Sequence, residues 1–329
     1  MAVNGVIIGA GLDVIVATSK GLVWKCGGKI MKYMAIAMAC LALIGCGTLN
    51  MRHSCVSMLE DMVLIPAGTN SGTNSLGSGE FYNPGFYPQT YSFTVSAFYM
   101  DKYEVTKAQW DEVYVWAIKH GYSFDNAGSG KGPNHPVQTV SWYDVVKWCN
   151  ARSEMEGKPI SYRVGRKVYR TGQIDAVSCA TNINGYRLPT DVEWEYAARG
   201  GASGRRFPWI DSNTIQHSRA NYNSYWAYDP SPTRGYHPAY TNGAMPYTSP
   251  VGSFAPNGYG LYDMVGNVDE WCWDWYPGYE GSSRVYRGGG WNSYAYNCRI
   301  AARLLVTPHY TDDSLGFRVV LPPGPTAAP

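Results

Sequence analysis

Residues 185–201 of this 329-residue chain read GYRLPTDVEWEYAARGG, and they carry more information about the fold than any other stretch. The run from Pro189 to Glu193 indicates the start of a helix, and the Gly200-Gly201 pair indicates its end. A second informative stretch, NGYGLYDMVGNVDEW, occupies residues 257–271. Both stretches combine glycines, which form turns, with aromatic residues, which usually pack in a core. This combination favours a globular domain.

Working outward, two more helices and three strands can be placed. The capping box in Thr106-Lys107-Ala108-Gln109 predicts a helix that runs to about residue 120. The sequence from Ser141 predicts another that ends near residue 155. Strands are expected at residues 62–66, at 93–99, where apolar and polar residues alternate, and at 315–321.

Composition excludes several classes of protein. Charged residues make up 16% of the chain, the net charge is +2 and the pI is about 8.0, so no nucleic-acid partner is expected. The 37 glycines and 20 prolines fall short of the share that marks low-complexity disorder. Twelve Trp and 27 Tyr predict a core built on aromatic rings. We interpret the long irregular stretch at residues 200–256 as packed loop.

The N-terminal region predicts export. From Met31 the chain reads MKYMAIAMACLALIGC, and its apolar run is too short to span a bilayer but fits a secretory signal. Leu43-Ile44-Gly45-Cys46 has the form of a lipobox, which would place a lipid on Cys46; a buried apolar helix is the alternative. The expected organisation is an upstream segment without function (1–30), a lipoprotein signal peptide (31–46), a tether (47–60), one domain (61–321) and a tail (322–329).

Two further motifs, RGGGW at 287–291 and LGFR at 315–318, complete a set with the two stretches above. In order and spacing this set resembles the formylglycine-generating (sulfatase-modifying) enzyme family over residues 61–321. The resemblance implies an α+β fold, C-type lectin-like and of the formylglycine-generating-enzyme sub-type. Such a fold has little regular secondary structure, and paired strands bring its termini together.

The resemblance also implies a structural calcium ion. The matching ligands would be Asp263, the backbone carbonyls of Gly266 and Val268, and Glu270. Calcium prefers such a mixture of carboxylate and carbonyl oxygens. The alternative is that Glu270 is a buried, hydrogen-bonded carboxylate without an ion. A second family site retains Asn221 but has Gly243 where an acidic ligand is expected.

The family's oxidase activity requires two cysteines and a copper ion. Ser293 occupies the position of the first cysteine, and the second has no counterpart because the loop is about three residues short. Cys298 lies beyond that place. A hydroxyl is a poor ligand for copper(I), so we expect neither copper nor catalysis. HExxH, GxSxG and Walker motifs are absent as well.

Residues 292–314 have an unusual composition. They contain no Lys, Glu, Gln, Met or Trp, although these five types make up about 15% of the chain. Randomising both adenines of an AAC or AAT codon gives NNY codons, which cannot encode any of the five. This pattern resembles the variable region of proteins that diversity-generating retroelements modify, among them the variable lipoproteins of spirochaetes.

We therefore expect a fixed framework around exchangeable side chains. The framework would be Trp291, Arg299, Arg303, Pro308 and residues 316–318. The candidate ligand-binding positions are Asn292, Ser293, Tyr294, Tyr296, Asn297, Ile300, Ala302, Leu304, Leu305, Val306, Thr307, His309, Tyr310, Thr311, Asp312, Asp313 and Ser314. The apolar run Leu304–Val306 would be hard to explain in an exposed loop without a partner. A plain structural loop with that run in the core is the alternative.

Together these features predict a non-catalytic binding lipoprotein in the cell envelope, anchored to the membrane by lipid and displayed at the outer surface. Its partner would be a protein or another cell-surface ligand, because tyrosine, serine and asparagine are typical of antibody-like binding loops. Two alternatives stay open: an oxidase of the formylglycine-generating type or another sulfur-oxidising enzyme, and a structural envelope protein.

Overall fold

A computed structural model describes residues 14–18, 21–26, 29–32, 61–73, 90–225, 229–230 and 232–324, and the chain divides into two units, Met1–Ser54 and Cys55–Pro329. In the first unit, β1 (Val14–Thr18), β2 (Gly21–Cys26) and β3 (Lys29–Lys32) form an antiparallel sheet. β3 includes the first two residues of the expected signal peptide. No helix among the described residues is long and apolar enough to cross a membrane.

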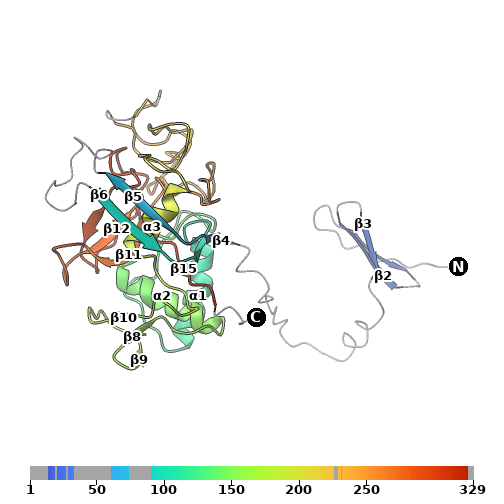
Figure 1. The fold of residues 1–329 in the computed structure, drawn as a ribbon. Helices are drawn as coiled ribbons and strands as arrows, with labels where there is room; N and C mark the ends of the chain where they lie inside the picture. The colour runs from blue at the N-terminus through green and yellow to red at the C-terminus, as the bar shows by residue number, and fades with distance from the viewer. Residues whose placement is uncertain are drawn as a thin grey trace. The chain divides into compact units, whose positions relative to one another are not determined.

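All three expected helices are present in the second unit (Figure 1). They are α1 (Lys107–Lys119), α2 (Trp142–Met155) and α3 (Asp191–Arg199). Each begins with a complete capping box, in which the N-cap hydroxyl and the N3 side chain satisfy backbone N–H groups at the helix start. α3 ends at Gly200 in the left-handed conformation, as the Gly-Gly pair predicted.

The strand predictions were only partly right. β4 (Met62–Ile65) confirms the first strand. Residues 90–101 form two strands, β6 (Thr90–Val95) and β7 (Phe98–Asp101), in different sheets, rather than one strand. The expected final strand is likewise divided into β14 (Leu315–Gly316) and β15 (Val320–Leu321). In both places the chain leaves one sheet and joins another within a few residues, which alternation of residue types cannot reveal.

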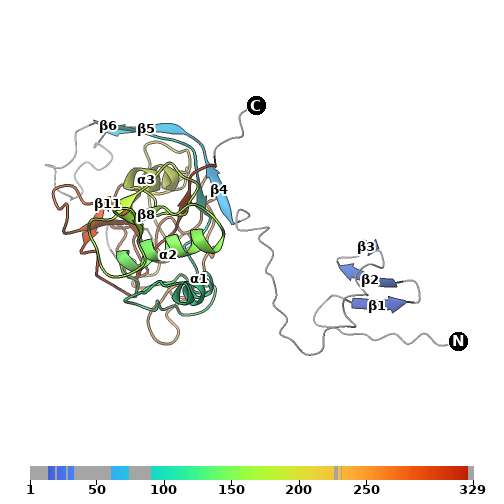
Figure 2. The same ribbon diagram turned by 90° about the horizontal axis from the view of Figure 1, so that it is seen from below.

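Two small sheets position the rest of the domain, and Figure 2 labels one strand of each, β4 and β11. In one, β7 pairs with both β4 and β15, so the first and last strands of the domain meet through a common neighbour. In the other, the order is β13-β12-β11-β14, formed by Leu304–Val306, Arg284–Arg287, Asp269–Trp275 and Leu315–Gly316. The remaining strands are β5 (Gly68–Thr73), β8 (Tyr162–Val164), β9 (Lys167–Val168) and β10 (Ser178–Cys179).

The core is aromatic, as the composition predicted. Five tryptophans are completely buried: Trp110, Trp142, Trp148, Trp194 and Trp271. The rings of Trp110 and Trp148 stack at 5.9 Å with an interplanar angle of 2°, and both meet the edge of Phe317. Residues 200–256 contain no helix or strand where the structure describes them, but Phe207, Ile215 and Tyr222 in this stretch are buried in a core cluster of their own. The stretch is therefore packed loop.

Candidate functional site: the display segment

Residues 292–314, here called the display segment, leave the core after buried Trp291 and return to it at buried Leu315. Four of the seventeen candidate positions are exposed, and eleven keep part of their surface exposed. The exposed ones are Tyr294, Tyr296, His309 and Tyr310. The partly exposed ones are Asn292, Ser293, Asn297, Ala302, Leu304, Leu305, Val306, Thr307, Thr311, Asp312 and Asp313.

Two candidate positions were predicted wrongly. Ile300 is 0% exposed and packs in a core cluster with Trp194 and Leu261. Its N–H donates to the Arg206 carbonyl (2.8 Å), and its own carbonyl accepts from Arg287 (2.9 Å), so the side chain is turned inward between two anchors. Ser314 is also buried, and its carbonyl accepts from the Asp269 N–H (2.7 Å). Both side chains are buried, against the expectation of exposed, exchangeable positions.

The apolar run Leu304–Val306 forms β13, an edge strand paired with β12, rather than a loop. Leu305 and Val306 each pack against a core cluster while keeping part of their surface exposed. These contacts account for Leu305 and Val306 without a partner. The structure thus supports part of the alternative interpretation for this strand.

Framework donors hold the display segment through its backbone carbonyls. The bonds run from Asn223 N–H to Ser293 (2.9 Å), from Thr139 N–H to Asp312 (2.9 Å), from Trp142 N–H to Pro308 (3.0 Å) and from the Trp291 indole to Asp313 (3.0 Å). A carbonyl is present whatever the side chain. Substitution at the accepting residue therefore leaves the bond available.

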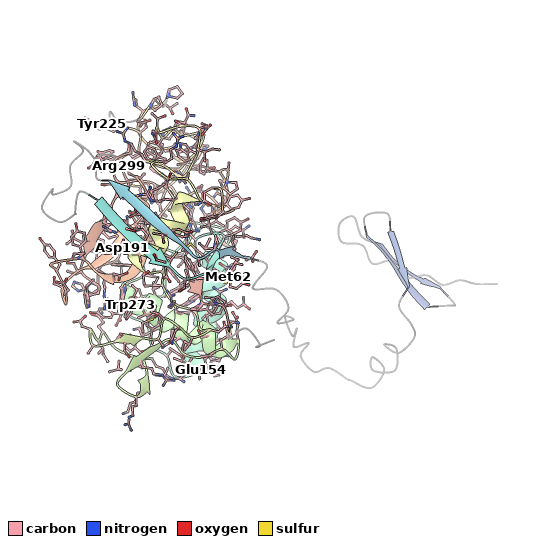
Figure 3. All side chains as sticks on the ribbon, viewed as in Figure 1. Met62, Glu154, Asp191, Tyr225, Trp273 and Arg299 are labelled. Carbon is pink, nitrogen blue, oxygen red and sulfur yellow. The ribbon has the colours of Figure 1, made fainter. Side chains whose placement is uncertain are left out.

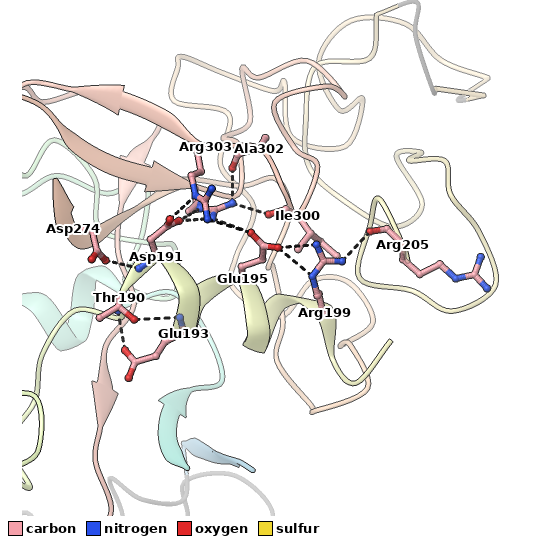
Figure 4. A network of polar contacts seen from close by, with 11 residues as sticks. Thr190, Asp191, Glu193, Glu195, Arg199, Arg205, Asp274, Ile300, Ala302 and Arg303 are labelled. Carbon is pink, nitrogen blue, oxygen red and sulfur yellow. Dashed lines mark hydrogen bonds and ion pairs between the residues drawn. The ribbon is translucent and has the colours of Figure 1, made fainter. Parts of the chain in front are cut away.

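A buried ion-pair network fixes the middle of the segment to α3 (Figure 4). Asp191 and Glu195 lie one turn apart on that helix. Arg287 pairs with both of them and also donates to the carbonyls of Ile300 and Ala302, at 2.9 Å each. Arg303 pairs with Asp191 from within the segment itself.

Opposite charges dominate this network. Burial alone would raise the pKa of Glu195, but Arg287, Arg199 and Arg303 outweigh it and hold the pKa below the usual value. The carboxylate therefore stays ionised against its cationic partners. Removing one partner would leave an uncompensated buried charge, which is costly.

The glycines of the RGGGW motif allow a close approach between chain segments. Gly289 has a φ of +76°, and a Cβ there would lie 2.6 Å from the Cys298 Sγ. Any other residue would push Cys298 out of the core. The motif is thus explained by packing beneath the display segment.

Asp269 forms the floor of the site at the start of β11. It is buried, which raises its pKa to about 8. The Ser293 Oγ lies 3.5 Å from its Oδ2, while Oδ1 has no hydrogen-bond partner. The position where the family's first cysteine is expected therefore pairs a hydroxyl with a carboxyl group.

Four described cysteines, Cys149, Cys179, Cys272 and Cys298, are free thiols. Cys298 is completely buried, and burial raises the pKa of its thiol well above the usual value. Such a thiol is poorly reactive and a poor metal ligand. Cys46, the expected lipid attachment site, lies outside the described residues.

The expected calcium ligands lie in a cluster of buried carboxylates. Asp263 Oδ2 accepts from the Gly252 N–H (2.6 Å), and Oδ1 is buried without a partner. Glu270 is bound by the Arg318 guanidinium and by the Trp194 indole (2.6 Å). Burial, Asp263 and Glu270 together raise the pKa of Glu104 well above its usual value.

The buried carboxylates of Glu104, Asp263 and Glu270 thus surround the single guanidinium of Arg318. Among their oxygens, Oδ1 of Asp263 has no hydrogen-bond partner. Arg318 already balances the charge of Glu270, which matches the alternative of a buried, hydrogen-bonded carboxylate. A divalent cation would therefore compensate mainly Glu104 and Asp263, and carboxylate oxygens are a donor type that calcium prefers. The described residues contain no cluster of three or more His, Cys, Asp or Glu side chains arranged as a metal site. Backbone carbonyls would have to supply the remaining ligands. The φ of +83° at Gly266 allows the chain to pass close to Asn221, where a Cβ would lie 2.4 Å from its carbonyl oxygen.

Sequence reasoning missed Glu104 and Tyr225. Glu104 contacts Val268 and Asn267 from 164 and 163 residues away, and no local pattern marks it. Tyr225 stacks against Tyr294 from the irregular stretch at residues 200–256. That stretch contains many tyrosines, and no motif or spacing distinguishes Tyr225 from the others.

The fold and the site define a C-type lectin-like domain of the formylglycine-generating-enzyme type. The model of the sulfatase-modifying factor enzyme 1-like domain matches residues 49–322, and the chain belongs to this family. It is 36% identical to the formylglycine-generating enzyme of Mus musculus, over 82% of this chain and 77% of that one. It is 30% identical to the inactive C-alpha-formylglycine-generating enzyme 2 of Bos taurus, over 78% and 87%.

A solved structure, Treponema denticola variable protein 1, superposes with a TM-score of 0.59 and 28% identity, covering 80% of this chain and 94% of that one. The relatives therefore include active enzymes, an inactive homologue and a protein named for its variability. Membership alone does not decide whether this chain is catalytic.

Proposed function

We propose that this chain is a non-catalytic binding protein whose display segment presents exchangeable side chains to a ligand. One observation carries the proposal: backbone carbonyls and framework residues anchor the segment, while fifteen of its seventeen candidate side chains keep exposed surface. Loops on a rigid scaffold accept substitutions at little cost in stability. The exposed tyrosines provide rigid contact area, and the partly exposed asparagines provide adaptable hydrogen bonding.

We further propose that a retroelement diversifies the segment, because its composition matches NNY codons. Sequencing the gene from many cells of one population tests this. Differences should concentrate at codons for residues 292–314, at adenine-derived positions, beside a template repeat and a reverse transcriptase gene. Differences scattered evenly along the gene would contradict the proposal.

In this proposal the chain is a lipoprotein of the outer cell surface, anchored through Cys46. Radiolabelled palmitate should enter the wild type and be absent from Cys46→Ser. Protease added to intact cells should cleave the domain of the wild type. Equal labelling of both proteins would rule out this anchor.

Structural calcium is part of the same proposal. Asp263, Glu270 and the carbonyls of Gly266 and Val268 would hold the ion, which would neutralise their charge and tie the chain near β11 to the core. Chelation with EGTA should lower Tm by several degrees, and calcium should restore it. Asp263→Asn should no longer respond to calcium. A wild-type Tm that ignores both additions would exclude the site.

The family membership favours one other candidate function, a formylglycine-generating-type oxidase. Two observations argue against an oxidase. Ser293 occupies the position of the first cysteine, and the thiol of Cys298 is completely buried. The test is incubation with copper and a cysteine-containing peptide, with the mouse enzyme as positive control and mass spectrometry as readout. We expect no aldehyde product; copper-dependent product formation would overturn the proposal.

A further inference from the structure

An exposed aromatic cluster extends from the display segment onto a loop outside it. Tyr225 is 56% exposed, and its ring lies 5.2 Å from that of Tyr294, which is 37% exposed. Tyr294 in turn lies 6.1 Å from Tyr296, which is 40% exposed. Tyr225 and Arg299, which follows this part of the segment, lie toward the same end of the domain in Figure 3.

The backbone holds Tyr225 beside the segment. Asn223 forms a parallel bridge with Tyr294, and its N–H donates to the Ser293 carbonyl at 2.9 Å. On the other side, Ser224 and Gly235 exchange two N–H to carbonyl bonds, of 2.7 and 3.0 Å. These bonds do not depend on the side chain at position 294, so Tyr225 keeps its place when that residue changes.

We propose that Tyr225 is a ligand contact that stays the same in all variants, and that the binding surface takes a polypeptide ligand. This inference rests on the proposed function. Tyr225 would supply fixed aromatic area, and residues 294 and 296 would supply the part that differs between variants. Tyrosine and arginine are the residues enriched at the energetic centres of protein–protein interfaces.

An arginine beside the cluster favours a polypeptide over a carbohydrate. The Arg234 side chain is 60% exposed and donates to the Asp229 carbonyl (3.1 Å) and to the Ser224 Oγ (3.4 Å). It thus contacts the residue that directly precedes Tyr225 in the chain. A guanidinium there can donate to the backbone carbonyls or carboxylates of a bound chain while the rings take its apolar side chains.

The test uses a random dodecapeptide phage library selected on the purified protein. Selected peptides are then synthesised and titrated by biolayer interferometry against the wild type, Tyr225→Ala, Tyr294→Ala and the control Tyr279→Ala. Tyr279 is a comparable tyrosine, 48% exposed, between β11 and β12. Thermal melts confirm that each variant is folded.

Peptide binding should weaken about tenfold in both Tyr225→Ala and Tyr294→Ala, as for an interface hot spot, and be unchanged in Tyr279→Ala. Loss in Tyr294→Ala alone would overturn the role of Tyr225 and leave the proposed function standing. No loss in either variant would count against the display segment itself. A library that yields no binder, or a glycan array that yields Tyr225-dependent binders instead, would overturn the polypeptide assignment.

Discussion

β12 and the display segment lie side by side, yet they are held in opposite ways. In β12, buried Val285 and Arg287 secure the strand through their side chains. In the display segment, carbonyl oxygens accept bonds from residues outside it, and most side chains remain partly exposed. The comparison teaches that side-chain identity determines stability in the first region and is available for recognition in the second.

The strongest test of this contrast is Arg287→Ala. It removes the partner of Asp191 and Glu195 and the donor to two segment carbonyls, so it should destabilise the protein by roughly 3–5 kcal/mol. Urea unfolding measures the loss. The control is Arg166→Ala, whose exposed side chain lies in the turn between β8 and β9 and should contribute within about 0.5 kcal/mol. Equal losses of unfolding free energy in the two variants would contradict the contrast between β12 and the display segment.

Within the segment, Ile300 and Tyr296 should differ sharply. Ile300→Ala leaves a cavity in the core and should cost roughly 2–4 kcal/mol. Tyr296→Ala removes an exposed ring and should change stability by about 0.5 kcal/mol or less. Denaturation midpoints of the two variants give the comparison directly. A Tyr296 variant as unstable as the Ile300 variant would mean that the segment is ordinary core.

The pH dependence of stability probes the framework near α3. Burial raises the pKa of Asp274, whose Oδ2 accepts from the Asp191 N–H, from 3.8 to about 6. The native state then holds this proton more tightly than the unfolded chain does. Its contribution is therefore present below about pH 4 and lost as the pH rises through 6, a change of about 3 kcal/mol. Asp274→Asn should flatten this slope in unfolding curves measured from pH 4 to 7.

A small effect per residue should come from changing the four exposed candidates together. Replacing Tyr294, Tyr296, His309 and Tyr310 by serine should alter stability by no more than about 1 kcal/mol, because none of these side chains anchors the segment. Calorimetry measures it. A loss comparable to that of Arg287→Ala would show that the exposed side chains hold the fold after all.

The helices could be predicted because their signals are local. Thr106, Ser141 and Thr190 each stand three residues before the side chain that completes the capping box. The strands were harder, since β6 and β7 or β14 and β15 are separated by a change of sheet that depends on distant partners. β13 could not be recognised from its three residues, because its pairing with β12 spans a long connection.

The candidate site shows the same limit. Its location between RGGGW and LGFR follows from the sequence, since those motifs form the framework. The inward orientation of Ile300 does not, because it depends on tertiary bonds to Arg206, which lies far away in the chain, and to Arg287, which precedes the segment. Glu104 and Tyr225 were missed for the same reason.

The four framework bonds to the display segment carry one further consequence. In each of them the segment accepts and the framework donates. Proline lacks an N–H group but keeps its carbonyl, and Pro308 already accepts from Trp142 in this way. At Asp312 and Asp313, too, proline would keep the accepting carbonyl, whereas at Ser293 it would remove the N–H that donates to the Gly290 carbonyl (3.0 Å).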